Sequence, residues 1–206
     1  PRVRRQRQMC IRDRYGTGQF QDGYLNIRGL SRRLTQVNTQ ISIPFILSNK
    51  GYGLLWNNYG LTDFNPADES IELTPASASG EAVTVNTTGT SGNVRETRQT
   101  YSFTASLEVP HSGRYSLLLD VGQRMARKYY LAIDGDKVFD INNLWLPPTT
   151  SAIVELSAGK HAIEVQGERN DKPVLYWRPV SEETVFRSPV AQTLSLIHIS
   201  EPTRQE

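Results

Sequence analysis

Strict alternation of apolar and polar residues constrains the fold of this chain more than any other feature of its sequence. Between residues 101 and 109, every second side chain is apolar: Tyr101, Phe103, Ala105, Leu107 and Val109. Side chains at this spacing share one face of a β-strand. Shorter strand-like runs follow, separated by turn residues, at 114–121, 128–134, 137–141, 153–165 and 174–177. The pattern predicts an all-β fold of the sandwich type, and no window has a convincing helical period.

The first third of the chain has a strand pattern of its own. Apolar runs at 41–47 and 52–56 flank turn residues at 48–51, which predicts a β-hairpin. Pro44 inside the first run indicates an edge strand or an irregular one. A Ser-, Thr-, Gly- and Ala-rich stretch at 74–93 indicates a boundary or a loose loop. We therefore expect two sandwich parts, at 15–66 and 67–179, with 180–193 returning to the first part.

Both ends of the chain look foreign to the fold. Residues 1–14 hold six arginines and one aspartate, which in isolation suggests a basic arm for nucleic acid or an acidic surface. The stretches MCIRDR and SLIHISEPTR instead resemble translated sequencing-adapter tails, so we expect 1–14 and 194–206 to be non-native and to lie outside the fold. Subtracting the +5 of residues 1–14 from the net charge of +2 leaves −3. Nucleic acid is therefore not an expected partner.

Catalytic and metal-binding candidates are few. Cys10, the only cysteine, lies in the excluded tail. His111 and His161 have no partner at metal-ligand spacing. Asp134 and Asp136 flank a glycine and could bind calcium in an acidic turn, but a tight hairpin turn explains their spacing better. We therefore expect no metal, no cofactor and no catalytic residue. In addition, no apolar run approaches the roughly 20 residues of a membrane span.

The tryptophans offer the best binding candidates. Trp177 falls in a strand pattern and is expected in the core, whereas Trp145 follows Asn142 and Asn143 and precedes two prolines in a predicted loop. An exposed indole stacks well on a sugar ring, and the neighbouring amides can hydrogen-bond hydroxyl groups. We expect Trp145, Asn142 and Asn143 to bind carbohydrate. The alternative is that Trp145 closes the end of the sandwich as a core residue.

The stretch from Tyr15 to Phe64 resembles the N-terminal β-sandwich of glycoside hydrolase family 31, especially its α-xylosidases. The resemblance is carried by YGTGQFQDGYLNIRG and VNTQISIPFILSNKGYGLLWNNYGLTDF. Residues 53–59 match the family's GLLWDNY-type motif, with Asn57 where the family commonly has aspartate. The resemblance implies that Asn38 and Gln40 lie in a loop that reaches toward the active site, so we add both to the carbohydrate-binding candidates.

Residues 101–177 resemble a protective-antigen-type (PA-14-like) sandwich. The likeness rests on Gly-Arg-Tyr at 113–115, Ile-Asp-Gly at 133–135, Ala-Gly-Lys-His at 158–161 and Tyr-Trp at 176–177. Some α-xylosidases of the family carry such a domain inside the N-terminal sandwich. The resemblance therefore implies a partial N-terminal sandwich interrupted at 67–179 by a jelly-roll-like β-sandwich.

The catalytic aspartates of the family lie on a (β/α)₈ barrel, which needs about 250 residues and has no counterpart here. The implied chain is a non-catalytic fragment of an enzyme that removes α-linked xylose or glucose. Its partners would be a xyloglucan-like or α-glucoside oligosaccharide and the missing barrel, with no membrane partner. The alternative is a free-standing carbohydrate-binding or adhesion module. The compartment stays open, and we favour the periplasm or secretion over the cytoplasm.

Overall fold

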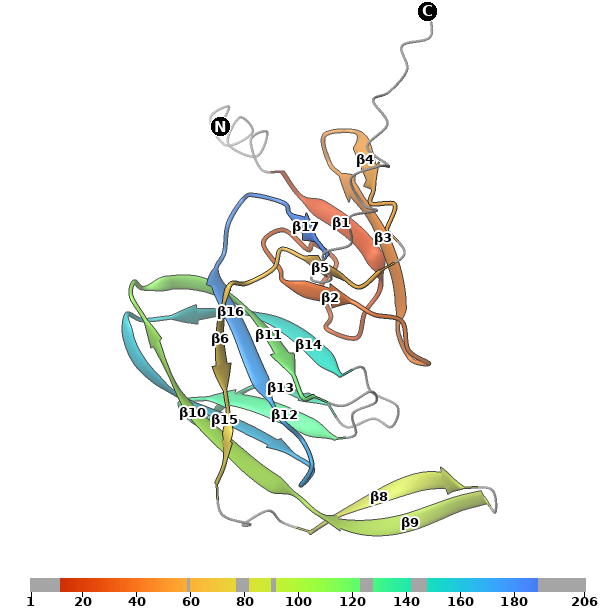
Figure 1. The fold of residues 1–206 in the computed structure, drawn as a ribbon, viewed down its shortest axis with the longest axis vertical. Helices are drawn as coiled ribbons and strands as arrows, with labels where there is room; N and C mark the ends of the chain where they lie inside the picture. The colour runs from red at the N-terminus through yellow and green to blue at the C-terminus, as the bar shows by residue number, and fades with distance from the viewer. Residues whose placement is uncertain are drawn as a thin grey trace, which may run out of the picture.

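The computed structural model describes residues 12–58, 60–76, 82–89, 92–122, 128–141 and 148–188. Every regular element of these residues is a β-strand, and Figure 1 shows them gathered into a two-sheet sandwich, a group of smaller sheets and a projecting hairpin. The predicted all-β fold of sandwich type is confirmed.

The sandwich consists of a five-stranded and a four-stranded antiparallel sheet. The five-stranded sheet has the order β13 (Asp136–Ile141), β12 (Tyr129–Ile133), β15 (Gly159–Gly167), β10 (Tyr101–Val109) and β7 (Thr74–Pro75). The four-stranded sheet has the order β14 (Thr149–Leu156), β11 (Gly113–Asp120), β16 (Val174–Pro179) and β6 (Glu69–Glu72). The hairpin of β8 (Ala82–Gly89) and β9 (Gly92–Gln99) extends away from the sandwich and leads into β10 (Figure 1).

Apolar side chains from both sheets fill the space between them. Leu107 and Leu131 come from the five-stranded sheet, Leu117 and Leu175 from the four-stranded sheet, and all four are fully buried. In the alternating sequence pattern that predicted the strands, these are the apolar positions. They face inward because the side chains on the inner faces of two packed sheets interdigitate. Trp177 packs against the same core, as predicted.

Strand β11 is buried on both faces. Tyr115, Leu117 and Leu119 point into the sandwich core, while Ser116 and Leu118 between them are also covered. The sequence of a strand that is covered on both faces is a nearly continuous apolar run, without the alternation of apolar and polar residues. The run RYSLLLDV in the sequence therefore indicates that something packs on the outer face of this sheet.

Two three-stranded sheets form the smaller body. One has the order β1 (Arg14–Gln19), β3 (Ile41–Ser48) and β4 (Tyr52–Leu55), and the other β17 (Phe186–Arg187), β5 (Thr62–Phe64) and β2 (Arg32–Leu34). They enclose a small core of Ile27, Leu30, Leu34, Ile46 and Phe64. The predicted hairpin of β3 and β4 is present, with Ser48 opposite Tyr52.

Two local expectations change in the structure. Pro44 lies in β3, the central strand of its sheet, and sits at the register shift of the β1–β3 pairing between Gly16 and Gly18. Of the two predicted options, an edge strand or an irregular strand, the structure shows the irregular strand. At the register shift, the β1–β3 ladder needs no hydrogen bond from the position of Pro44, which has no N–H to donate. Arg14, assigned to the tail, opens β1 and is only 5% exposed. The folded part therefore includes Arg14.

The chain enters and leaves the sandwich through neighbouring strands. Strand β6 pairs antiparallel with β16, so Glu69 lies opposite Trp177. Just outside the sandwich, β5 pairs with β17, so Phe64 lies opposite Phe186 (Figure 1). The segments before β6 and after β16 thus run side by side.

Candidate functional site

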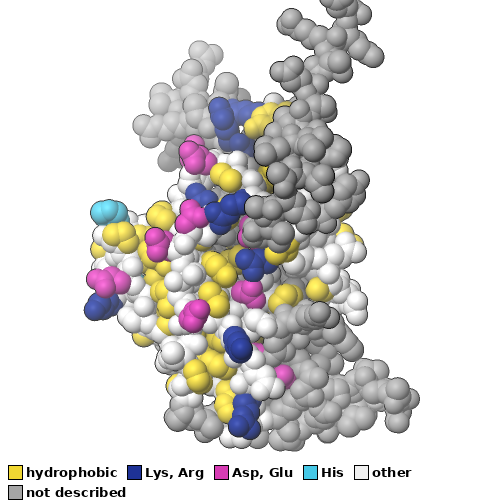
Figure 2. Space-filling model, in the orientation of Figure 1, with side chains coloured by type: hydrophobic (Ala, Val, Ile, Leu, Met, Phe, Trp, Pro, Cys, Tyr) yellow, Lys and Arg dark blue, Asp and Glu magenta, His cyan; other side chains and the backbone are white. Residues whose placement is uncertain are grey.

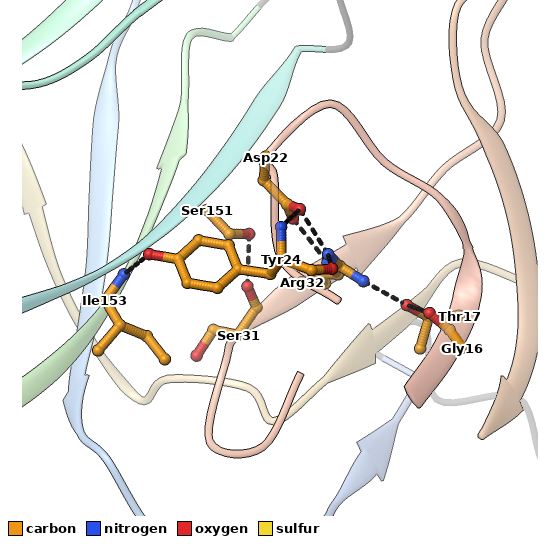
Figure 3. Close-up of polar contacts among 8 residues, drawn as sticks. All are labelled: Gly16, Thr17, Asp22, Tyr24, Ser31, Arg32, Ser151 and Ile153. Carbon is orange, nitrogen blue, oxygen red and sulfur yellow. Dashed lines mark hydrogen bonds and ion pairs between the residues drawn. The ribbon is translucent and has the colours of Figure 1, made fainter. Parts of the chain in front are cut away.

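A buried ion pair organises the loop between β1 and β2. The Arg32 guanidinium donates to both Asp22 carboxylate oxygens, at 2.7 and 2.5 Å, and to Thr17 Oγ1 at 2.7 Å. Its Cζ lies 4.4 Å from the Phe20 ring centroid. The two charged side chains are 2% and 4% exposed. Figure 3 shows Arg32 held between Asp22 and Thr17, which fixes the loop.

Thr17 reaches Arg32 because its backbone takes an unusual conformation. Its φ is 64°, between Gly16 and Gly18, which also have positive φ. A Cβ on Gly18 would lie 2.1 Å from the Ile41 carbonyl oxygen, so only glycine fits there. The Gly-x-Gly of the sequence is thus a bulged strand that delivers a threonine hydroxyl.

The same loop attaches the smaller body to the sandwich through hydrogen bonds. The Ser31 backbone N–H donates to Ser116 Oγ at 2.7 Å, and Ser151 Oγ donates to the Ser31 carbonyl at 2.5 Å. The Ile153 N–H donates to the Tyr24 hydroxyl at 2.9 Å (Figure 3). This loop is what covers the outer face of β11 and β14.

Arg33 adds a charged contact across the junction. It donates to Asp63 at 2.9 Å in the smaller body and to Asp120 at 2.7 Å in the sandwich. It also lies 5.4 Å from the Tyr176 ring centroid. Burial of Arg33 lowers its pKa, but the hydrogen bond and charge of Asp63 and the charge of Asp120 outweigh it, so the pKa is raised. Arg33 therefore stays charged.

A small cavity lies at this junction. It is lined by Phe20, Gln21, Asp22, Arg33, Gln40, Thr149, Thr150 and Ser151. Its volume is about 10 Å³, roughly what one water molecule needs. A sugar ring does not fit into a cavity of this size.

Two of the predicted binding residues lie beside this junction. Gln40 is 2% exposed, and its Nε2 donates to the Thr35 carbonyl at 2.8 Å. It closes a turn with Val37, and Asn38 is exposed in that turn. Asn142, Asn143 and Trp145 lie outside the described residues. The structure therefore places Asn38 and Gln40 in the same turn. Sugar binding by all five candidate residues stays a prediction.

A larger open cleft lies between the β1–β3–β4 sheet and residues 182–186. Its volume is about 410 Å³, within the range of roughly 300–1,000 Å³ typical of small-ligand sites. It is lined by Arg12, Arg14, Ile46, Tyr52, Leu54, Glu182, Glu183, Thr184 and Phe186. The lining combines two aromatic rings, carboxylates and guanidinium groups. Its residues come from three distant segments, so no local motif pointed to it.

Trp56 is engaged in packing. Its ring stacks on Phe186 with a centroid distance of 5.6 Å and an interplanar angle of 6°. This contact fixes the segment of β17 that borders the cleft.

The described residues contain no cluster of three or more His, Cys, Asp or Glu side chains that could hold a metal ion. They also contain no helix long and apolar enough to span a membrane. On the face drawn in Figure 2, the described acidic and basic side chains are interspersed over the surface.

His161 has a carboxylate partner that the sequence did not suggest. Its Nδ1 lies 2.6 Å from Asp134 Oδ2, and its Nε2 lies 2.8 Å from the Ser157 carbonyl oxygen. Asp134 has a φ of 53° in the predicted tight turn with Gly135. The Ser157 carbonyl and the Asp134 carboxylate raise the pKa of His161 above 6.5, and the hydrogen bond from His161 lowers the pKa of Asp134.

We expect the His161 imidazole to titrate above 6.5 in an NMR pH titration. Because the folded-state pKa is raised, this contact stabilises the fold fully below the unfolded value, and the contribution is lost as pH rises through the folded pKa. Asp134→Asn should move the titration back toward 6.5, since asparagine tolerates positive φ but carries no charge. Titration of the unaltered protein at or below 6.5 would contradict the contact.

The fold and its contacts thus define a β-sandwich unit with a second, smaller β-body attached, and comparisons with known proteins relate it to carbohydrate-active enzymes. No protein-family model matches the chain. An uncharacterized family 31 glucosidase, ORF2, of Pseudescherichia vulneris is 54% identical over 44 residues, which are 21% of this chain and 8% of that protein. An α-xylosidase of Saccharolobus solfataricus is 56% identical over 46 residues, which are 22% of this chain and 6% of that protein.

A solved structure extends the likeness to most of the fold. The crystal structure of a family 31 α-xylosidase from Xanthomonas citri matches with a TM-score of 0.54 and 20% identity, over 85% of this chain and 23% of that one. The chain is therefore related to family 31 glycoside hydrolases over part of its length. It spans less than a tenth of the curated relatives and under a quarter of the solved enzyme.

Proposed function

We propose that this chain is a non-catalytic N-terminal part of a family 31 glycoside hydrolase of the α-xylosidase or α-glucosidase type. The observation that carries the proposal is the identity of 54–56% over about 45 residues to a family 31 glucosidase and an α-xylosidase. The fold likeness to a third member over 85% of the chain supports it. In this role the chain supports a catalytic barrel elsewhere in the parent and contributes carbohydrate binding.

The sandwich at 67–179 is, in this proposal, a protective-antigen-type insert within the first sandwich. The topology supports this division, because β6 and β16 are neighbours and the flanking strands β5 and β17 pair with each other. Residues 15–66 and 180–193 then form one body around the insert, with 1–14 and 194–206 as non-native tails except at Arg14. A periplasmic or secreted location goes with this proposal.

Binding is proposed to involve Trp145, Asn142 and Asn143, with Asn38 and Gln40 from the smaller body. The ligand is a xyloglucan-like or α-glucoside oligosaccharide. Asn38 supports this assignment because it is exposed at a turn, where recognition groups usually lie. Gln40 would act by holding that turn, since its amide is already bonded to Thr35.

We expect the purified chain to hydrolyse neither aryl α-xylosides nor aryl α-glucosides, because the barrel that carries the family's aspartates has no counterpart here. It should bind a xyloglucan oligosaccharide in calorimetry, and Trp145→Ala should weaken that binding while leaving the melting temperature nearly unchanged. Turnover at a typical enzymatic rate of ~1–10³ s⁻¹ that survives repurification would overturn the proposal. A collapse in stability of Trp145→Ala would remove that residue from the site.

The rival function is a free-standing carbohydrate-binding or adhesion module. The continuous core of the sandwich favours it, since such a unit can fold without the rest of an enzyme. Sequencing the source DNA past Gln192 separates the two functions. A downstream barrel with an aspartate at a strand end supports the enzyme, and its absence supports the module.

A further inference from the structure

The floor of the open cleft in the smaller body is set by strand register. Arg14 on β1 lies opposite Ser48 on β3, and Ser48 lies opposite Tyr52 on β4. Directly opposite residues share one face of a sheet, so these three side chains form a row across the strands. Residues 182–186 form the facing wall of the cleft. A guanidinium and an aromatic ring on the floor thus face carboxylates on the wall.

The Arg14 guanidinium on this floor keeps most of its donor capacity unused. Arg14 is 5% exposed, and its Nη1 donates to the Ser48 hydroxyl at 3.2 Å and to the Asp13 carbonyl at 3.3 Å. Its Nε is buried and has no hydrogen-bond partner, and no carboxylate of the described residues pairs with its charge. Buried charges in proteins are normally paired, as those of Arg32 and Arg33 are here.

Three further polar groups border the cleft without using their hydrogen-bonding capacity. Tyr52 is 46% exposed, and its hydroxyl has no partner in the described part of the chain. The same holds on the wall for the Glu183 carboxylate and the Thr184 hydroxyl, within the ranges that the structure describes. Beside Tyr52, Leu54 is 42% exposed and adds apolar surface to the floor. The cleft therefore offers free donors and acceptors next to an apolar platform.

The wall of the cleft is already held in place. The Val185 N–H donates to Asn65 Oδ1 at 3.0 Å, and the Phe186 ring stacks on Trp56 with a centroid distance of 5.6 Å. A ligand that enters between this wall and the sheet therefore has little protein to order, which lowers the cost of binding.

Charges of both signs in the lining select the class of ligand. The carboxylates of Glu182 and Glu183 disfavour an anion, and the Arg14 guanidinium disfavours a cation. An apolar layer over the cleft would bury charged groups that have no partner, which is costly. A neutral molecule with many hydroxyl groups can accept from the guanidinium and donate to the carboxylates. Sugars combine such hydroxyl groups with an apolar ring face that packs on an aromatic side chain.

We propose that this cleft binds a neutral oligosaccharide, with one sugar ring lying on Tyr52. The sugar hydroxyl groups accept hydrogen bonds from the Arg14 guanidinium and donate to the Glu183 carboxylate and the Thr184 hydroxyl. The inference deepens the proposed function, because it rests on carbohydrate binding by this chain and adds a site that shares no residue with the five candidates above. Arg12, which also borders the cleft, lies in the predicted tail and has no part in it.

An NMR titration of the 206-residue chain with xyloglucan heptasaccharide tests the proposal. We expect the amide signals of Gly53 and Thr184 to shift. Tyr52→Ala should weaken binding by about five- to ten-fold, since it removes the ring platform. Glu183→Gln should weaken it by about ten-fold, since it removes a charged acceptor. Phe45→Ala is the matched control, because Phe45 is 39% exposed on the opposite face of the same sheet and should leave binding unchanged.

Binding that neither Tyr52→Ala nor Glu183→Gln weakens would overturn the proposal, as would the absence of amide shifts around the cleft. Tighter binding of glucuronate than of the neutral sugar would contradict the ligand class. A thermal melt of each variant separates lost binding from lost folding, and Glu183→Gln carries the test if Tyr52→Ala unfolds.

The outcomes also separate this inference from the proposed function. Sugar binding that Trp145→Ala abolishes and Tyr52→Ala leaves intact retains the proposed function and removes the cleft. Cleft binding in a protein whose reading frame past Gln192 encodes no barrel retains the cleft and removes the glycosidase assignment.

Discussion

Replacing Arg32 by alanine should destabilise the protein by about 3–5 kcal/mol in equilibrium urea unfolding. The change leaves Asp22, whose side chain is 4% exposed, as an uncompensated buried charge, and removing one partner of a buried pair costs about this much. Thr17 loses its donor, and the Phe20 ring loses the cation above it. The loop that joins the smaller body to the sandwich should then lose its order first.

Two variants make the Arg32 result specific. Arg28→Ala removes an exposed contact with Glu182 and should cost at most about 1 kcal/mol, as for surface ion pairs. Arg32→Met combined with Asp22→Asn removes both charges and should be less destabilising than Arg32→Ala alone. If Arg32→Ala costs no more than Arg28→Ala, the buried pair does not hold the loop.

Leu117→Ala should destabilise the sandwich by about 2–5 kcal/mol, because it leaves a cavity in a core that cannot fully collapse. Leu117 is fully buried at the centre of β11, between the two sheets. Thermal unfolding followed by circular dichroism measures the loss. Leu25→Ala is the matched control, since Leu25 is 80% exposed and the same substitution there should change stability by less than about 0.5 kcal/mol. Equal effects of the two variants would place Leu117 outside the core.

The strands of the sandwich could be predicted because their signals are local. The alternation in β10 and the Asp134-Gly135 turn act over a few residues, and both have the expected structure. Pro44 was harder to place, because its tolerance depends on a register shift in a partner strand 26 or more residues earlier in the chain. The position of a strand within its sheet depends on which strands pair with it, and those partner strands can lie far away in the sequence.

The junction and the cleft could not be predicted for the same reason. Arg33 finds Asp120 across 87 residues, and Ser31 meets Ser151 across 120. Nothing in the spacing of these residues marks them as partners, since serine and arginine are common on surfaces. A detectable signal was the continuous run in β11, which indicates a covered outer face without saying what covers it.

The side-by-side arrangement of β6 and β16 has a consequence for the order in which the molecule folds. Asn65 and Val185 hydrogen-bond across 120 residues, and closing so long a loop in an unstructured chain carries a large entropy cost. Once the sandwich has formed, Glu69 and Trp177 are already neighbours. The loop that still has to close then consists only of the two short segments that lead from these residues to Asn65 and Val185. Because closure entropy grows with the logarithm of loop length, this lowers the cost of joining β5 to β17 by about 1–2 kcal/mol. We therefore expect the sandwich to close before β5 pairs with β17, so that the formed sandwich holds the two strands of the smaller body close together.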